Sequence, residues 1–486
     1  MALFTEPQKA QLRERGITED EARRQLALIA SPRAYADLVR PCRIDDGIET
    51  IPGDRQEALI LLHDEAARQG RCSKFVPASG AATRMFQDLL AGRGVGPLLA
   101  DVDRLAFAGD LRAELVFRGQ DLDALRSAGG GAQIVDALLG ADGLGYATMP
   151  KGLVPFHRYA NGTRTAFEEQ LVESAGYVRD ADDHCRVRFT VSPEHLHAFR
   201  LLAGRVTPSY ESALRARFDV RLSVQKASTD TIAASPAGGP FVAADGRLVL
   251  RPSGHGALLL NLAELGGDIV FIKNIDNVQT DARRGDTLRW KKILCGRLLE
   301  LQRSLFLHVA RLRSRPPSPE FVADAASFAR RELAIDAQGP ELERALARPL
   351  RVCGVVRNTG EPGGGPFWVR GGSGRVSRQI VEAAQIDPAS DVQRAVLDEA
   401  THFNPVDLVC GLQDVEGSAF NLHDFVDPRS AMVSQKSHEG RELLALERPG
   451  LWNGAMAEWI TVFIEVPIST FTPVKTVMDL LRPEHQ

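Results

Sequence analysis

The chain has 486 residues, enough for two or three domains that each bury a core. Its 44% hydrophobic and 25% charged residues are ordinary for a globular protein, and its net charge of −4 gives no electrostatic reason to expect nucleic acid as a partner. No run of roughly eighteen uninterrupted apolar residues occurs, which excludes a membrane-spanning helix of the usual kind.

The cysteines and the N-terminal residues bear on location. The first 26 residues carry charges throughout and lack the apolar core of a signal peptide. The six cysteines form no C-x-x-C pair, so neither a disulfide scaffold nor a structural zinc site is expected. They are Cys42, Cys72, Cys185, Cys295, Cys353 and Cys410. Together these features predict a cytoplasmic protein.

The N-terminal region is predicted to be helical. Residues 5–40 contain a capped turn at Thr18 and an apolar stripe that begins at Ala22. A second helix is predicted over 55–69, where apolar residues recur at helical spacing. We therefore expect residues 1–70 to form a helical cap on the catalytic body.

The stretch 74–86, KFVPASGAATRMF, is predicted to be a strand, a turn of small residues and the start of a helix that continues to Leu90. This order presents backbone N–H groups to a phosphate. Small residues in such a turn are equally often only close packing. Arg84 favours the phosphate interpretation, because a guanidinium in the first helical turn opposes the helix dipole unless it faces an anion.

Strands and helices alternate from residue 74 to about residue 312. Strands are expected within 185–192, 219–224 and 266–273, and a long amphipathic helix is expected from Leu288 to about Arg313. The third strand is apolar throughout, which is typical of a strand buried on both faces of a parallel sheet. The pattern predicts an α/β protein with a doubly wound, mostly parallel sheet.

Several polar residues follow these predicted strands or lie in Gly/Pro loops. In an open α/β sheet, ligands bind beyond the carboxyl ends of the strands. Lys151, Gln225, His255 and Asp276 satisfy this condition together with the 78–84 loop. Taken singly, the lysine could be a solvated loop residue and the histidine part of an ordinary surface turn. Their convergence predicts one binding site.

Asp276 carries the strongest chemical signal. It lies between Asn274 and Asn277 at the end of a buried apolar strand. A lone carboxylate there is costly unless it is paired or bound to a cation. A Mg²⁺ ligand is therefore favoured over an Asx turn.

The Pro-rich segment at 315–319 is the predicted boundary of the α/β part. We predict a nucleotide-binding catalytic domain over 71–315, after the cap at 1–70, and a C-terminal α+β region over 320–486 that completes the acceptor site. Lys475 lies near the end of that region, where it is either a plain surface lysine or reaches out of an apolar stretch towards a ligand.

Five short motifs, in the same order, resemble those of UDP-sugar pyrophosphorylases in the nucleotide-diphospho-sugar transferase (Rossmann-like) superfamily. They are GAATRM at 80–85, PKGLVPFH at 150–157, GHG at 254–256, NIDN at 274–277 and FTPVKTVMDLL at 471–481. With the segments GEPGGGPFWV, THFNPVDLVC and PGLWNGAMA, the whole chain also resembles a bacterial family known as a domain of unknown function.

The resemblance implies a nucleotidyltransferase that joins an NTP, expected to be UTP, to a sugar 1-phosphate and releases pyrophosphate. It implies Mg²⁺ as cofactor with Asp276 as its ligand, small-molecule substrates, and neither nucleic acid nor membrane insertion. The implied catalytic residues are Arg84, Lys151, Asp276 and Lys475. The implied nucleotide-binding residues are Ala78, Ser79, Gly80, Ala81, Ala82, Thr83, Gln225, Gly254, His255, Gly256, Asn274 and Asn277. The expected acceptor-binding residues are Glu361, Gly364, Trp368, Asn404 and Asn453.

Three features depart from the family pattern. Ala82 replaces the second glycine of the nucleotide loop, Ala257 stands where glucose-specific members tend to carry an acid, and the insert 376–450 has no counterpart. Two alternatives stay open: a nucleotide-sugar binding protein without turnover, and a glycosyltransferase with a nucleotide-sugar donor. The latter usually holds its metal with a D-x-D pair, but Asn274 stands two residues before Asp276.

Overall fold

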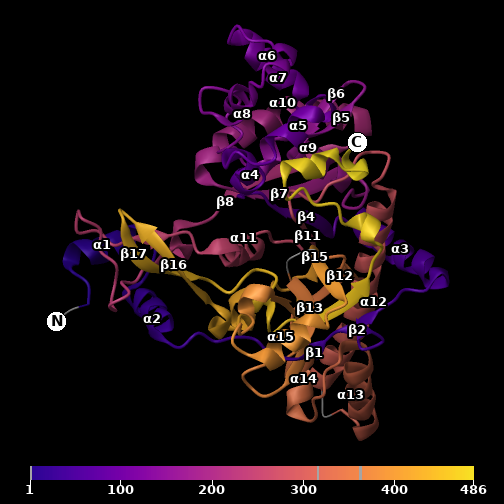
Figure 1. Ribbon diagram of the computed structural model, residues 1–486. Coiled ribbons are helices and arrows are strands. Elements are labelled where there is room, and N and C mark those ends of the chain that lie inside the picture. Colours follow the sequence, from indigo (N-terminus) through magenta and orange to yellow (C-terminus); the bar gives the residue numbers. More distant parts are fainter. Residues whose placement is uncertain (1–2, 81, 315–316, 361–363) are drawn as a thin grey trace. The chain divides into compact units, whose positions relative to one another are not determined.

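The computed structural model describes residues 3–80, 82–314, 317–360 and 364–486 (Figure 1). They divide into two compact units. Unit 1 comprises residues 1–56, 225–269 and 297–466, and unit 2 comprises 57–224, 270–296 and 467–486. The three-part division drawn from the sequence is a different partition of the chain and stays a prediction.

The strands of unit 2 have the order β11–β4–β7–β8. They are β4 (Cys72–Pro77), β7 (His184–Val191), β8 (Arg217–Val224) and β11 (Ile269–Lys273). The pairs β4–β7 and β7–β8 are parallel. All of β11 and nearly all of β4 are buried, as expected for strands covered on both faces. The prediction of an α/β fold with mainly parallel strands is confirmed.

Helices and one hairpin complete unit 2. The hairpin pairs β5 (Pro155–Tyr159) with β6 (Gly162–Thr165). The helices are α3 (Gly53–Arg68), α4 (Gln87–Leu90), α5 (Val95–Ala100), α6 (Ala108–Phe117), α7 (Leu122–Ser127), α8 (Gly131–Leu139), α9 (Ala166–Ser174), α10 (Leu196–Leu214) and the first part of α12 (Gly285–Arg313). All nine residues of α9 are buried, and its first turn is closed by a capping box between Thr165 and Glu168.

The prediction of an α-helix that begins at Thr83 is wrong. Residues 82–84 form a 3-10 turn, and only one α-helical turn, α4, follows. The amide of Ala82 donates to the carbonyl oxygen of Met149, and the amide of Lys151 donates to that of Gly80. Since these contacts tie the loop to 149–151, the backbone leaves the helical path. A long helix dipole therefore does not act at Arg84.

Unit 1 contains a five-stranded arrangement in the order β2–β3–β18–β12–β15. The strands are β2 (Arg43–Ile44), β3 (Gly47–Glu49), β18 (Ile460–Glu465), β12 (Leu350–Arg357) and β15 (His402–Gly411). Neighbouring strands are parallel except β12 and β15, which are antiparallel.

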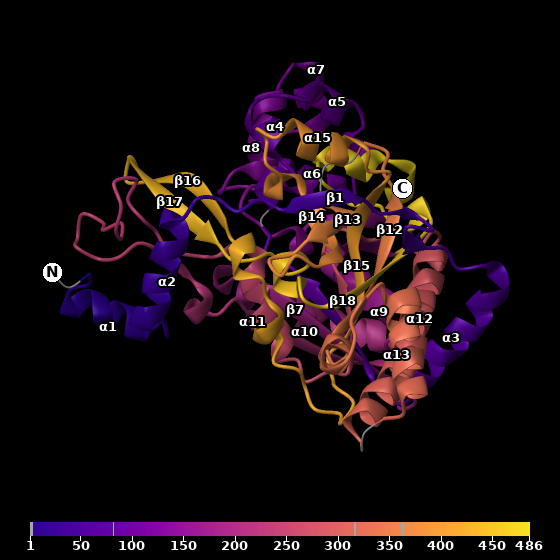
Figure 2. The same cartoon turned by 90° about the horizontal axis from the view of Figure 1, so that it is seen from below.

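A second, antiparallel sheet of unit 1 has the order β1–β13–β14 (Figure 2). Its strands are β1 (Asp37–Pro41), β13 (Gly364–Arg370) and β14 (Val376–Glu382). Since β1 occupies 37–41, the helical prediction for 5–40 holds only as far as residue 30. Two small pairs are β9 (Thr231–Ile232) with β10 (Leu250–Arg251), and β16 (Met432–His438) with β17 (Arg441–Glu447).

The helices of unit 1 are α1 (Glu6–Glu14), α2 (Glu19–Ala30), α11 (Leu258–Ala263), the last part of α12, α13 (Pro319–Leu333), α14 (Pro340–Leu346) and α15 (Asp391–Asp398). Helices α12 and α13 run side by side (Figure 2), and Arg297 pairs with Glu332 between them at 2.8 Å. None of the helices in the described ranges is long and apolar enough to cross a bilayer.

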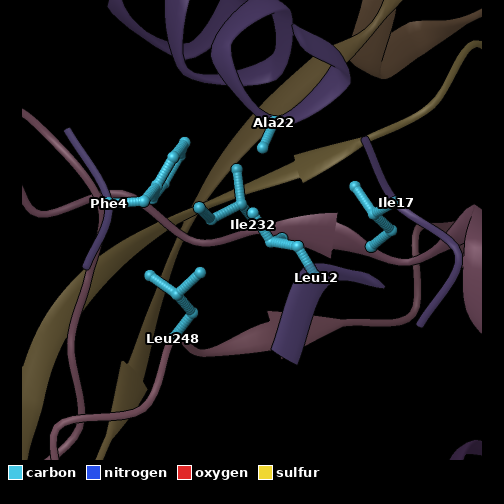
Figure 3. Packing of buried hydrophobic residues seen from close by; sticks show 6 residues of the cluster. All are labelled: Phe4, Leu12, Ile17, Ala22, Ile232 and Leu248. Atoms are coloured by element: carbon cyan, nitrogen blue, oxygen red, sulfur yellow. The ribbon is translucent and has the colours of Figure 1, made fainter. Parts of the chain in front are cut away.

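The N-terminal helices pack within unit 1 on the segment around β9. Figure 3 shows Leu12 of α1 and Ala22 of α2 gathered round Ile232 and Leu248, with Phe4 and Ile17 beside them. Ala22 belongs to the apolar stripe predicted from the sequence. This cluster attaches α1 and α2 to residues 225–269.

Candidate functional site

A lysine–aspartate–lysine cluster follows strand β11 in unit 2. The Nζ atom of Lys151 lies 2.8 Å from Oδ2 of Asp276, and the Nζ atom of Lys475 lies 3.5 Å from the same oxygen. Asp276 is 7% exposed. Three of the four residues predicted to be catalytic are thus brought together from distant parts of the sequence.

Backbone contacts hold the C-terminal segment beside Asp276. The amide of Val474 donates to the carbonyl oxygen of Asp276 at 3.0 Å, and the amide of Thr472 donates to Oδ1 of Asn277 at 3.0 Å. The carbonyl oxygen of Val474 in turn accepts from Nζ of Lys151 at 2.8 Å. Lys151 lies in a 3-10 turn and is buried, so it is not a solvated loop lysine.

The charges of this cluster do not cancel. Burial acts to raise the pKa of Asp276, but the neighbouring Lys475 and Lys151 outweigh burial and hold this pKa below its ordinary value. Asp276 is therefore ionised at neutral pH. Two ammonium groups facing one carboxylate leave one positive charge in excess, which suits an anionic ligand.

The small-residue loop is closely tied to its surroundings. Besides the amide of Ala82, the amide of Ala78 is occupied and donates to the carbonyl oxygen of Thr190. The Oγ1 atom of Thr83 donates to the carbonyl oxygen of Ala147, and the carbonyl oxygen of Ser79 accepts from Ser192. Ala81 lies outside the described residues.

Two residues of this loop differ sharply in exposure. Ala82 is 0% exposed, so its methyl group packs in the interior, whereas Arg84 is exposed. Arg84 therefore offers a positively charged side chain to an anion.

The Gly-His-Gly turn belongs to unit 1 and packs on the 449–454 segment. The ring of His255 stacks on Trp452 with centroids 4.2 Å apart, and its Nδ1 accepts from the amide of Leu451 at 3.1 Å. A Cβ atom at Gly256 would lie 2.2 Å from the carbonyl oxygen of Pro449, so only glycine fits. His255 is therefore a packed residue rather than part of a plain surface turn.

Of the other residues predicted to bind the nucleotide, Asn274 and Asn277 lie in unit 2 and Gln225 lies in unit 1. In unit 2, Asn277 is buried and its Nδ2 atom has no hydrogen-bond partner among the described residues, while the backbone carbonyl of Asn274 accepts from Gln170 at 2.8 Å. In unit 1, the buried Nε2 atom of Gln225 also has no partner within the part of the chain that the structure describes. Whether the unit 1 residues serve the same ligand as the lysine–aspartate–lysine cluster stays a prediction.

The residues predicted to bind the acceptor are all in unit 1 and have diverse roles. Glu361 lies outside the described residues, and Gly364 begins β13. Trp368 donates from Nε1 to the carbonyl oxygen of Asp46 at 3.3 Å, and Asn404 donates to that of Gly354 at 3.2 Å. These contacts give Trp368 and Asn404 a structural function.

Asn453 is the acceptor candidate that lines a cavity. This cavity in unit 1 has a volume of about 300 Å³. Its polar lining includes Arg33, Asp37, Arg370, Gln379, Arg429 and Asn453. Asn453 donates from Nδ2 to Gln385 at 2.9 Å, while its buried Oδ1 atom has no hydrogen-bond partner in the described ranges.

The carboxylate of Asp276 is chemically suited to bind Mg²⁺. The carboxylate is a hard oxygen donor of the kind Mg²⁺ prefers, and Mg²⁺ commonly takes one or two carboxylates and completes its shell with water and substrate phosphates. The Oδ2 atom already faces Lys151 and Lys475. A Mg²⁺ ion at Oδ2 would compete with these two ammonium groups.

A different set of possible ligand atoms lies elsewhere in unit 2. His63, Cys72 and Cys295 are buried, and their ligand atoms lie within 4.8 Å of one another. Nitrogen and sulfur are poor ligands for Mg²⁺. Both ring nitrogens of His63 are also engaged, by Asp64 and by the carbonyl oxygen of Tyr177, each at 2.8 Å. This group does not provide the magnesium site.

Sequence reasoning missed a buried charge network beside the site. Glu173 of α9 accepts from Lys74 at 3.0 Å, from Lys273 at 2.6 Å and from the hydroxyl of Tyr177 at 2.9 Å. Burial lowers the pKa of Lys74 to about 7. The available signal was a lysine inside each of two apolar strands, which is costly without a buried partner.

The same helix also supports the Asp276 loop directly. Nε2 of Gln170 donates to the carbonyl oxygens of Asn274 at 2.8 Å and Ile275 at 3.3 Å, the two residues that precede Asp276. Gln170 is completely buried. Nothing in the sequence of α9 marked this role, because it depends on the packing of α9 on β11.

Solved UDP-sugar pyrophosphorylases are similar to this fold. For the UDP-N-acetylglucosamine pyrophosphorylase of Trypanosoma brucei the TM-score is 0.52 at 14% identity, over 98% of this chain and 79% of that chain. For the UDP-glucose pyrophosphorylase of Leishmania major the TM-score is 0.48 at 14% identity, over 99% and 79%. The first comparison assigns the fold to the class found in UDP-sugar pyrophosphorylases, as the motifs predicted.

The chain belongs to the family described as domain of unknown function DUF4301, whose model matches residues 5–486. The resemblance to a family of this kind is thereby confirmed. No curated protein matches the chain in sequence.

Proposed function

We propose that the protein is a nucleotidyltransferase that makes a nucleotide sugar from an NTP, with UTP as the expected nucleotide, and a sugar 1-phosphate. The observation that carries the proposal is the cluster of Lys151, Asp276 and Lys475, with its excess positive charge. The fold class and the order of the five motifs support it. Transfer of this kind needs in-line positioning and charge neutralisation rather than an acid–base pair.

In the proposed reaction an oxygen of the sugar phosphate attacks the α-phosphorus, the bond to the β-phosphate breaks and pyrophosphate leaves. Lys151 contacts the α-phosphate and Lys475 the sugar phosphate, so both lysines exchange Asp276 for phosphate oxygens. Asp276 would hold Mg²⁺, which would neutralise phosphate charge when bound. The exposed Arg84 binds the β- and γ-phosphates.

We also propose which residues recognise the base, the ribose and the acceptor. Gln225 and the 254–256 turn contact the base and ribose, and Asn453 contacts the acceptor. We further propose that the fold has a doubly wound sheet, an N-terminal helical cap and a C-terminal region that completes the acceptor site. The proposed location is cytoplasmic. Substrates are small molecules, with no nucleic acid partner.

The test is pyrophosphate release by the purified protein with Mg²⁺, UTP and a panel of sugar 1-phosphates. Lys151→Ala and Asp276→Ala each remove a group that acts on transferring phosphates, so we expect a rate loss of about a hundredfold or more. Lys436→Ala, at an exposed lysine of β16, is the matched control and should leave the rate unchanged. A folded wild-type protein that releases no pyrophosphate with any NTP and acceptor contradicts the proposal.

One observation favours a second candidate, a nucleotide-sugar binding protein without turnover. The amides of Ala78 and Ala82 are already used by protein carbonyls, so the loop offers fewer donors to a triphosphate. This candidate predicts that calorimetry detects binding of a nucleotide sugar while no pyrophosphate is released. A glycosyltransferase would instead release a nucleoside diphosphate from the same ligand.

A further inference from the structure

Two buried histidines join the C-terminal end of the chain to helix α9. Nδ1 of His157 lies 3.0 Å from Oε1 of Glu169, and Nε2 of His157 lies 2.8 Å from Nδ1 of His485. The two imidazole rings stack with centroids 5.1 Å apart. His485 also hydrogen-bonds the backbone of Thr472. A continuous contact chain thus runs from α9 to the tail.

The burial of His485 is unusual for its position. Residues 482–486 are otherwise exposed or half-buried, yet His485 is 3% exposed, and His157 and Glu169 are 0% and 1% exposed. Burying an imidazole costs free energy unless its nitrogens are hydrogen-bonded. The hydrogen bonds to His157 and Thr472 offset this cost.

The segment that His485 closes is the one that carries Lys475. Because His485 contacts Thr472, residues 472–485 form a loop whose two ends meet. The lysine side chain is 49% exposed and reaches Asp276 only at 3.5 Å. Its amide donates to Asp479 at 2.8 Å, within the same loop. The position of Nζ therefore depends on how firmly this loop is held.

The motif around Lys151 is tied to the tail at both of its ends. At one end Lys151 contacts Asp276 and the carbonyl oxygen of Val474, and at the other end His157 contacts His485. Glu169 and Gln170 are neighbours on α9, and they hold His157 and the backbone before Asp276. Helix α9 thus supports two segments of the charged cluster directly and the third through His157.

We propose that His485 is a positioning residue: through His157 and Glu169 it holds the 472–485 loop so that Lys475 lies beside Asp276. This inference rests on the proposed function for the role of Lys475, which it deepens. His485 does not touch the reacting atoms and acts through Lys475.

Other charged groups surround this contact chain. Glu169 also accepts from the hydroxyl of Tyr159 at 2.6 Å and lies 3.5 Å from Arg164, which pairs with Asp281. On the tail, Arg482 pairs with Asp479 at 2.8 Å. Arg164 thus places a positive charge near Glu169 from a residue other than His157.

Hydrogen–deuterium exchange tests the positioning without any ligand. His485→Phe keeps a ring of similar shape but removes both hydrogen bonds, and we expect amides in 472–480 to exchange about fivefold to tenfold faster, as for the loss of a buried hydrogen bond. His485→Asn places a side-chain amide, which can present either its oxygen or its nitrogen, near the Nδ1 position and should restore much of the protection. Glu484→Gln is the neighbouring control. Unchanged exchange in His485→Phe overturns the proposal.

A double-mutant cycle tests whether His485 acts through Lys475. We expect Lys475→Ala and His485→Phe each to weaken binding of UDP-glucose in calorimetry, because Lys475 is proposed to contact the sugar phosphate, and the double variant to bind like Lys475→Ala alone. Additive losses overturn the proposal, because His485 would then act independently. If the wild-type protein binds no UDP-sugar, the proposed function fails, whereas the exchange experiment still decides the positioning role.

Discussion

The two units place their candidate ligand groups in different physical settings. In unit 2 the candidate residues are charged, mostly buried and joined by ion pairs, from Lys151 and Asp276 to the network on Glu173. In unit 1 the turn around His255 is held by ring stacking and by close backbone approach at Gly256. The charge of the unit 2 cluster suits an anionic group, whereas the turn around His255 in unit 1 is held mainly by packing.

The largest effect is expected where unit 2 depends on buried charge. Glu173→Gln leaves the ammonium groups of Lys74 and Lys273 without their counter-charge, so we expect a loss of about 3–5 kcal/mol in the free energy of unfolding. Urea denaturation followed by circular dichroism measures this loss. Glu65→Gln, at an exposed pair with Arg68, is the control and should cost less than about 1 kcal/mol. Equal losses would show that the buried network is no more important than a surface pair.

The pH dependence of the free energy of unfolding is a second test of the buried charge in unit 2. The folded-state pKa of Lys74 is lowered to about 7 by burial, below its value of about 10.4 in an unfolded chain. Between these values the unfolded chain binds more protons, so stability rises with pH by up to about 1.4 kcal/mol per pH unit. Below pH 7 both states are protonated and this contribution is constant. Lys74→Met should remove the slope, and urea denaturation at pH 6, 7, 8 and 9 tests it. An unchanged slope would refute the assignment.

A substitution at Gly256 tests how tightly the turn in unit 1 is packed. Gly256→Ala puts a Cβ atom 2.2 Å from the carbonyl oxygen of Pro449, so the 449–454 segment must move. We expect a loss of about 1–3 kcal/mol in stability, read as a lower melting temperature. Gly53→Ala in unit 1 meets no atom within 4 Å and is the matched control. Equal melting temperatures for both variants would mean that the contact does not stabilise the turn.

The smallest effect is expected at Ala82. Because its methyl group is completely buried, Ala82→Gly removes core packing and adds backbone freedom, at a cost of about 1 kcal/mol. Affinity for UTP in calorimetry should change little, since the methyl group does not face a ligand. A clear gain in affinity or turnover would instead show that the loop backbone approaches the nucleotide and that the loop has drifted from the usual family geometry.

Much of the fold could be predicted from local sequence. The apolar run before Asn274 became β11, the alternating residues after Cys185 became β7, and the amphipathic residues after Leu288 became α12. Such patterns depend on periodicity, which is a property of neighbouring residues. The helix expected after Thr83 failed because contacts with residues 149–151, some sixty-five positions away, decide the backbone path there.

Only part of the candidate site could be predicted, because motifs are local in sequence whereas contacts between distant segments are not. Lys151, Asp276 and Lys475 could be selected because each stands in a motif with the right residue types. Gln170, His157 and His485 could not be assigned a role, because their hydrogen bonds cross more than a hundred residues of sequence, apart from the shorter step from His157 to Glu169.

By itself the sequence determined the α/β class, the main strands and the long helix between residues 185 and 313, and the residue types able to meet phosphates, since composition, periodicity and motif order are local. Only the tertiary structure decided that Asp276 is shared by two lysines, that Ala82 faces the interior and that α9 supports the charged cluster. These features depend on burial and on distances between remote segments. Both arise only when the chain is packed.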